Sequence, residues 1–179
     1  MGRKAVQLGP DDPRAHLALG WMHWYSGNRT AAKLSFERAI ELNPSLADAW
    51  WALASILSDE RPDEALALAK KAVRLSPRDQ SVSIALHICA VCAFLGEHDE
   101  QAVEWERKSV AHPAGPQSYR LLGAALGHLG KIEEAREAID EAMRRAPNFT
   151  LITLRAGNSP RLVNRLVEGW RKAGWSPPP

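Results

Sequence analysis

The sequence predicts an all-α protein, built as a right-handed superhelix of antiparallel helix pairs and ended by a C-terminal capping helix. A similar seven-residue segment ending in proline recurs without gaps, at residues 4–10, 38–44 and 71–77. The closing prolines are 34 and 33 residues apart, and Pro113 and Pro147 are again 34 apart. Small residues such as Gly20, Ala32 and Ala39 stand where paired helices must approach closely. A fixed period of this length indicates a solenoid of helix pairs.

The first complete repeat explains this pattern in physical terms. Helices are expected over residues 13–26 and 29–42, with Pro13 in a first helical turn and Gly27 ending the first helix. Phe36 would fill the space between the two helices, and Pro44 would end the second one because it cannot continue the backbone hydrogen bonds.

Residues 19–44 resemble the tetratricopeptide repeat. The matching positions are Leu19, Gly20, His23, Ala32, Phe36, Ala39 and Pro44. The resemblance implies an α-solenoid, and divides the chain into a partial repeat (1–12), four repeats (13–46, 47–79, 80–115 and 116–149) and a C-terminal helix with a tail (150–179). The third repeat is degenerate, because Glu106 stands where phenylalanine is expected and Gly96 is one residue too far from Ala102.

A narrower resemblance concerns the end of the chain. Residues 166–175 are similar to the end of the repeat region in certain bacterial adenylate cyclases and winged-helix transcriptional regulators, with Trp170 in place of leucine. This resemblance implies a bacterial signalling module without the catalytic or DNA-binding domain. The partial repeat at residues 1–12 agrees with it and predicts a piece of a longer protein, although a short N-terminal capping turn is the alternative.

The last predicted helix has two possible positions. Ser159 is a suitable N-cap, Pro160 a suitable first residue, and Leu162, Leu166 and Trp170 form an apolar stripe at helical spacing. A solenoid needs a terminal element to cover its last repeat, which favours a capping role. The alternative is that this helix folds back into the groove or docks on another subunit.

Composition excludes several classes of function. The net charge of +2 is too small to indicate nucleic-acid binding, and the basic C-terminal segment favours a solvated helix face. No apolar run approaches the ~20 residues that a membrane-spanning helix needs. Two cysteines and no secretory signal predict a cytoplasmic protein.

The sequence predicts no catalysis, metal or cofactor. Cys89 and Cys92 form a single pair, whereas a structural zinc site requires four ligands, and both cysteines fall on core positions of a helix. His16 and His23 replace aromatic residues of the repeat and are interpreted as packing residues. No phosphate-binding glycine loop is present.

The first helices of the repeats are expected to line a concave face that binds a protein or peptide. The candidate groove residues on this face are Trp21, Tyr25, Trp51, Phe94, Arg120 and His128. Large aromatic side chains often dominate the energy of protein interfaces. They could instead pack against neighbouring helices or the chain's own tail.

Three functions therefore remain open: a scaffold for a partner, a regulatory segment of a cyclase or transcription regulator, and homo-oligomerisation through the uncapped N-terminal end. A carboxylate clamp like that of chaperone-binding relatives is not expected, because Leu17, Trp21 and Ser55 occupy the matching positions.

Overall fold

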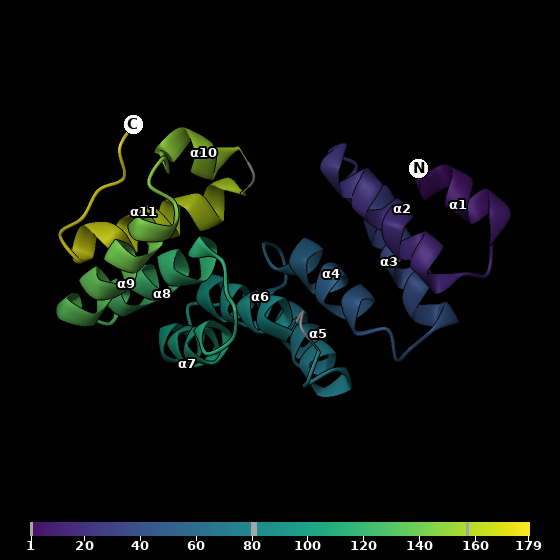
Figure 1. Cartoon of the computed structure of the whole chain (residues 1–179), viewed down its shortest axis with the longest axis horizontal. Helices are drawn as coiled ribbons and strands as arrows, with labels where there is room; N and C mark the ends of the chain where they lie inside the picture. The colour runs from purple at the N-terminus through teal and green to yellow at the C-terminus, as the bar shows by residue number, and fades with distance from the viewer. Residues whose placement is uncertain (1, 80–81, 157) are drawn as a thin grey trace.

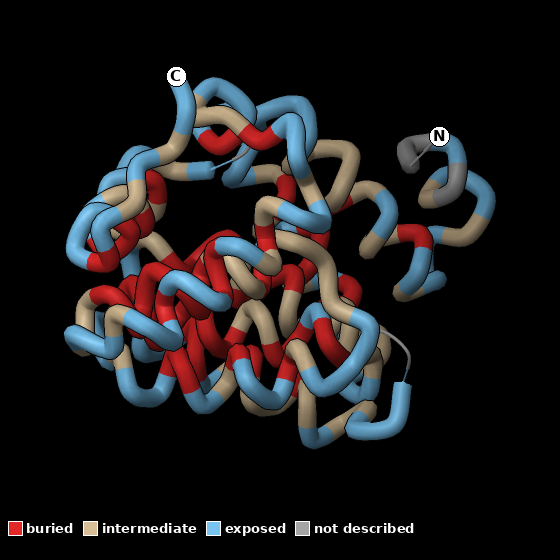
Figure 2. The backbone as a smooth tube through the Cα atoms, turned by 60° about the vertical axis from the view of Figure 1, so that its left-hand side comes forward, coloured by how far each residue is buried: buried red, intermediate tan, exposed pale blue. Residues whose placement is uncertain are grey.

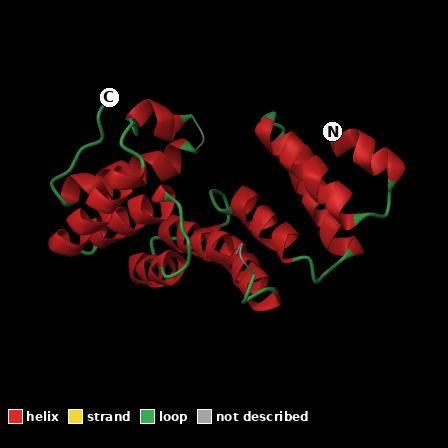
Figure 3. Cartoon of the chain, in the orientation of Figure 1, coloured by secondary structure: helices red, strands yellow, loops and turns green. Residues whose placement is uncertain are grey.

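The computed structural model describes residues 2–79, 82–156 and 158–179, and every regular element in these ranges is an α-helix (Figures 1 and 3). The first helices of the four pairs are α2 (Pro13–Tyr25), α4 (Ala47–Leu57), α6 (Val82–Leu95) and α8 (Pro116–His128). The second helices are α3 (Arg29–Leu42), α5 (Pro62–Leu75), α7 (Asp99–Val110) and α9 (Ile132–Arg145). A short α1 (Gly2–Leu8) packs against α2, and α10 (Leu151–Arg155) and α11 (Pro160–Lys172) end the chain. The prediction of an all-α solenoid is confirmed.

Neighbouring pairs stack in chain order, so buried residues gather where the helices face one another (Figure 2). Within the first pair, α2 and α3 lie close together because glycine stands at their contact. A Cβ atom added to Gly20 would lie only 2.3 Å from the buried ring of Phe36.

The predicted start of the third repeat, at residue 80, lies outside the described residues. Within the described ranges, no helix has both the length and the apolar character needed to cross a bilayer.

The turn of the third repeat corrects one detail of the sequence analysis. Gly27 and Gly130 turn the first and fourth pairs with φ angles of +79° and +71°. The equivalent residue in the third repeat is Glu97, with φ 63°, and not Gly96. Glu97 stands five residues before Ala102, just as Gly27 stands five before Ala32, so the apparent extra residue disappears. A left-handed glutamate costs roughly 1 kcal/mol relative to glycine.

Helix α10 lies in a stretch where the sequence shows no helical period. Thr150 caps it, because its hydroxyl accepts from the backbone N–H of Thr153 while the Thr153 hydroxyl accepts from that of Thr150. The backbone N–H of Leu151 also donates to the carbonyl of Pro178 at 2.9 Å. The C-terminal tail therefore returns to the start of α10 and ties that segment down.

Candidate functional site

Helix α11 crosses the face formed by the first helices of the repeats. It packs chiefly against α8, and also touches α6 and α9 (Figure 1). The closest approach is between backbones: a Cβ atom on Gly127 of α8 would lie 2.0 Å from the carbonyl oxygen of Gly169. Trp170 is buried beside this contact and its indole N–H donates to the carbonyl of Arg120 at 2.8 Å. From the sequence, this helix could either cap the last repeat or lie in the groove.

The N-terminal half of α11 is held by contacts distant in sequence. Arg165 donates to the carbonyl of Phe94 at 2.7 Å and to both carboxylate oxygens of Asp99 at 2.7 and 2.8 Å. Hydrogen bonds between an arginine and an ionised carboxylate are among the strong polar contacts in proteins. These contacts fix α11 against the C-terminal end of α6.

The start of α11 reaches still farther, to the turn between α4 and α5. Ser159 caps the helix, as predicted, and its hydroxyl also donates to the Asp59 carboxylate at 2.5 Å. Arg161 donates to the carbonyls of Leu95, at 2.6 Å, and of Asp59. Helix α11 is therefore tied to the second, third and fourth repeats.

A groove of about 620 Å³ remains beside α11 on the same face. Its walls come from α2, α4, α6 and α8 on one side and from α10 and α11 on the other. The groove is lined by four of the six candidate residues, namely Trp21, Tyr25, Trp51 and Arg120. Its apolar lining from the C-terminal segment includes Leu154, Leu162 and Leu166.

The aromatic end of the groove is a contiguous cluster. The Trp21 ring lies 5.1 Å from that of Trp51 and 6.2 Å from that of Tyr25, measured between centroids. Trp21 also packs edge-on against the core ring of Phe36, at 5.1 Å. Tyr25 is 83% exposed, so it extends this cluster into solvent. The indole N–H of Trp51 donates to Asp48 at 3.0 Å, which orients the Trp51 ring.

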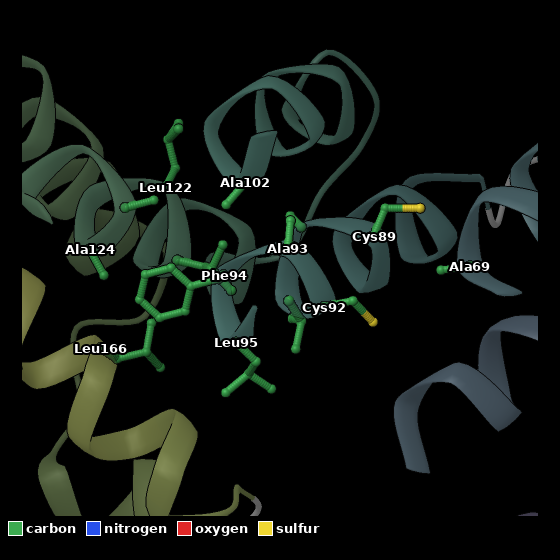
Figure 4. Packing of buried hydrophobic residues seen from close by; sticks show 14 of the residues in the cluster. Ala69, Cys89, Cys92, Ala93, Phe94, Leu95, Ala102, Leu122, Ala124 and Leu166 are labelled. Carbon is green, nitrogen blue, oxygen red and sulfur yellow. The ribbon is translucent and has the colours of Figure 1, made fainter. Parts of the chain in front are cut away.

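The other two candidate residues, Phe94 and His128, are separated from the groove by α11. Phe94 is fully buried, and Figure 4 shows its ring between Leu166 of α11 and Ala124 of α8. His128 packs against Phe94, with ring centroids 5.6 Å apart, and its Nε2 lies 3.0 Å from the carbonyl of Arg165. A partner can touch Phe94 only if α11 leaves, whereas His128 is half-buried. The chain's own tail occupies the C-terminal part of the expected concave face.

The groove also contains charged residues that the sequence analysis did not select. Arg29 stacks over Trp24 at 5.2 Å and donates to the carbonyl of Ile56 at 2.8 Å. Its guanidinium lies 3.9 Å from the carboxylate of Asp59. Arg29 is the first residue of α3 and Asp59 lies in the turn after α4. The repeat pattern assigns no role to either position, so the sequence did not point to these residues.

A buried acid lies behind the groove wall. Glu106 is fully buried, and one of its carboxylate oxygens contacts Nδ1 of His87, whose ring lines the groove. The other oxygen has no hydrogen-bond partner among the described residues. Burial raises the pKa of Glu106 above its ordinary value, against the opposing effects of the charge and hydrogen bond of His87. The glutamate at a phenylalanine position was the available sequence signal.

This polar cluster does not have the arrangement of a catalytic relay. The hydroxyl of Ser118 lies 3.4 Å from Nδ1 of His87, the same nitrogen that contacts Glu106. A relay requires the nucleophile and the acid on opposite nitrogens of the imidazole. Ser118 is also buried, so its hydroxyl is not open to solvent.

The two cysteines are buried in α6. Burial raises the pKa of Cys89 to about 12 and also raises that of Cys92, so the reactive thiolate form is disfavoured. Among the described residues, no group of three or more His, Cys, Asp or Glu side chains is placed to hold a metal ion.

Replacing Glu106 with glutamine tests the charge of the buried acid. Since the folded-state pKa is raised, ionisation opposes folding, and the wild-type free energy of unfolding should fall as pH rises through the raised pKa. Glu106→Gln lacks this ionisation, so its stability relative to wild type should increase as the pH is raised from 4 to 7.5. Urea denaturation at a series of pH values measures the difference.

The exposed Glu104 provides the control. Its pKa is lowered by a hydrogen bond to Lys108, so the wild type should lose stability relative to Glu104→Gln as pH falls, the opposite sign. Parallel stability curves for wild type and Glu106→Gln would contradict the expected ionisation.

Comparison with known families agrees with the helix pairs. Tetratricopeptide repeat models match residues 17–80 and 116–149, which together make up more than half of the chain. This chain belongs to the tetratricopeptide repeat family. No curated protein sequence gives a significant match.

Solved structures of other tetratricopeptide repeat proteins share the fold. The type IV pilus biogenesis factor PilW superposes with a TM-score of 0.77 at 20% identity, over 97% of this chain and 74% of PilW. YrrB, a tetratricopeptide repeat protein described as having an unusual peptide-binding site, gives 0.65 at 15% identity, over 96% and 90%. A thermophilic tetratricopeptide repeat protein from Thermus thermophilus gives 0.69 at 19% identity, over 92% and 87%. At these identities the likeness concerns the fold.

The tetratricopeptide repeat fold supports a role as a protein–protein interaction scaffold. The resemblance to cyclase and transcription-regulator repeat regions has no counterpart among these matches and stays a prediction. The same holds for homo-oligomerisation.

Proposed function

We propose that this tetratricopeptide repeat protein is a non-catalytic scaffold that binds a peptide, or an extended segment of a partner protein, in the groove between α2, α4 and α10–α11. The observation that carries the proposal is the aromatic cluster of Trp21, Tyr25 and Trp51 on the wall of a 620 Å³ groove. Tryptophan and tyrosine are among the residues most enriched in interface hot spots.

The fixed positions of the groove side chains also support this proposal. Trp51 is held by its hydrogen bond to Asp48, and Trp21 by its packing on Phe36. Side chains that are already ordered lose little entropy when a ligand binds. The opposite wall is also fixed, because Ser159 and Arg161 tie α11 to Asp59. The groove is therefore preformed.

The volume of the groove favours a ligand that is an extended peptide segment over one that is the surface of a folded domain. Helix α11 fills the adjoining part of the concave face, so the open space is limited to the groove between α11 and the first helices of the repeats. Pockets of a few hundred cubic ångströms accept a few side chains, whereas two folded domains meet over broader and flatter patches.

Selection from a displayed random peptide library against the wild-type chain tests the proposal. The dissociation constants of the enriched peptides should rise about 10-fold or more for Trp51→Ala and for Tyr25→Ala, as measured by fluorescence polarisation. Tyr25 is a useful probe because its exposure makes the variant structurally mild.

Trp105→Ala is the matched control. Trp105 lies on α7 between Lys70 and Lys108, away from the groove lining, so its removal should leave peptide binding unchanged. Failure to enrich any peptide, or equal loss of binding in the Trp105 variant, would overturn the assignment of the groove.

A further inference from the structure

The tryptophans of the groove differ in what their indole N–H groups contact. The N–H of Trp51 donates to Asp48 at 3.0 Å, so Trp51 presents chiefly its ring face to a ligand. Trp21 and Trp24 also line the groove, and among the described residues neither indole N–H has an acceptor. In the described part of the chain, the one fully buried side-chain nitrogen or oxygen without a partner belongs to Glu106, so both indole nitrogens reach the surface. The groove therefore carries two hydrogen-bond donors that a ligand can use.

Several acceptors beside these donors are already occupied. Arg29 donates to the carbonyl of Ile56 at 2.8 Å. Arg161 donates to the carbonyl of Asp59. The carboxylate of Asp59 accepts from Ser159 and lies 3.9 Å from the guanidinium of Arg29. A ligand at this end of the groove, which is formed by α2, α4 and the turn after α4, thus finds free donors more readily than free acceptors.

This imbalance favours a particular kind of backbone. Ser55 and Ser58 offer the ligand hydroxyl oxygens, since their protons are donated to backbone carbonyls of α4 at 2.9 and 3.0 Å. Each ordinary residue of an extended peptide brings one carbonyl and one N–H, and an N–H that is buried without a partner weakens binding. Proline avoids this cost, because it keeps the carbonyl and lacks the N–H.

The arrangement of the rings suits proline as well. The rings of Tyr25, Trp21 and Trp51 follow one another along the wall, with centroid distances of 6.2 and 5.1 Å and interplanar angles of 33° and 40°. Grooves lined by aromatic side chains are a recurring docking surface for proline-rich segments. Such segments already favour the extended polyproline II conformation, so they lose little entropy when they bind.

We propose that the groove binds a proline-rich extended segment of the partner. Its pyrrolidine rings pack on Tyr25, Trp21 and Trp51, and its carbonyls accept from the indole N–H groups of Trp21 and Trp24. This inference rests on the proposed function and adds the chemical class of the ligand.

Substitutions in the ligand test the two properties of proline separately. Peptides enriched from the displayed random library on the wild-type chain are synthesised with each proline kept, replaced by alanine, or replaced by N-methylalanine. Alanine restores the backbone N–H, whereas N-methylalanine lacks both the N–H and the closed ring. Fluorescence polarisation gives the dissociation constant of each form.

We expect the enriched peptides to share prolines at a fixed spacing. Replacement of a bound proline by alanine should weaken binding about 10-fold, because it leaves an N–H without an acceptor. N-methylalanine should recover a large part of this loss, since it introduces no N–H.

Substitutions in the protein test the donors. Trp21→Phe and Trp24→Phe keep an aromatic ring and remove the indole N–H, so each should weaken binding of the proline-containing peptides about 3-fold to 10-fold. Trp105→Phe is the matched control, because the indole N–H of Trp105 also has no acceptor among the described residues but its ring lies outside the groove lining. This variant should bind like wild type, and circular dichroism verifies that all three variants are folded.

The outcomes separate the two proposals. Enriched peptides without proline, or alanine forms that bind as tightly as the proline forms, overturn the proline inference alone when Trp51→Ala still loses binding. A loss that N-methylalanine does not recover, or unchanged affinity in both Trp21→Phe and Trp24→Phe, contradicts the match between donors and carbonyls. Absence of any enriched peptide counts against both the groove and its ligand.

Discussion

Trp170→Ala is expected to lower the free energy of unfolding by about 4 kcal/mol, the largest effect anticipated for a single substitution in this chain. Trp170 is 1% exposed, and it packs edge-on against Phe149 and Trp175 at centroid distances of 6.0 and 5.4 Å. Its removal leaves a cavity between α8 and α11. It also removes the hydrogen bond to the carbonyl of Arg120.

Guanidinium or urea denaturation followed by circular dichroism measures this change. Trp105→Ala is the matched control, because Trp105 is partly exposed on α7 and is flanked by the lysines at 70 and 108. Because Trp105 packs only partly against the core, its removal should cost about 2 kcal/mol or less. Similar losses in the two variants would show that α11 is not part of the cooperative core.

Gly127→Ala is expected to destabilise the protein by about 2–3 kcal/mol, although the same change favours a helix in isolation by about 1 kcal/mol. The added Cβ atom would lie 2.0 Å from the carbonyl oxygen of Gly169. That atom belongs to the backbone of α11, so it can move only if the helix moves. The sign of the effect is therefore opposite to the one that helix propensity predicts.

Thermal unfolding of Gly127→Ala and of Gly96→Ala provides the comparison. A Cβ atom on Gly96 would meet the ring of His98, at 3.1 Å, and a carboxylate oxygen of Asp63, at 3.4 Å. Both of these side chains are exposed and can shift, so the Gly96 variant should stay within about 1 kcal/mol of wild type. A stabilised Gly127 variant would contradict the close crossing of α8 and α11.

The local pattern of residues was enough to predict each helix pair. Pro13 and Gly27 act within a few residues of their own position, so the start and end of α2 follow from them. The same holds for Ser159 as the N-cap of α11. Capping and turn preferences depend on short-range hydrogen bonds and backbone angles, which is why a single sequence reveals them.

Other local features were less visible. Glu97 adopts a left-handed conformation that favours glycine, and α10 is stabilised by the pair Thr150 and Thr153 and by contact with Pro178. For α10, the contact with the distant Pro178 adds to this local cap. The buried Glu106 was noticeable as a departure from the repeat, but its contact with His87 required the structure.

The candidate groove was predicted in part. The repeat register placed Trp21, Tyr25 and Trp51 on the concave face, and the structure brings them to one wall of the groove. The same register placed Phe94 and His128 on that face, yet α11 covers both. Whether these residues bind a partner stays a prediction.

The sequence by itself determined the helix pairs, their stacking period and the faces that their first helices share, because these depend on spacing along one chain. Only the tertiary structure decided where α11 lies. The apolar stripe of α11 could pack either on the end of the last repeat or on the concave face. The position that α11 takes depends on contacts such as Gly127 with Gly169 and Arg161 with Asp59. Such contacts join residues far apart in sequence and have no local signal, so the groove left beside α11, with Arg120 at its wall, is present only when the chain is folded.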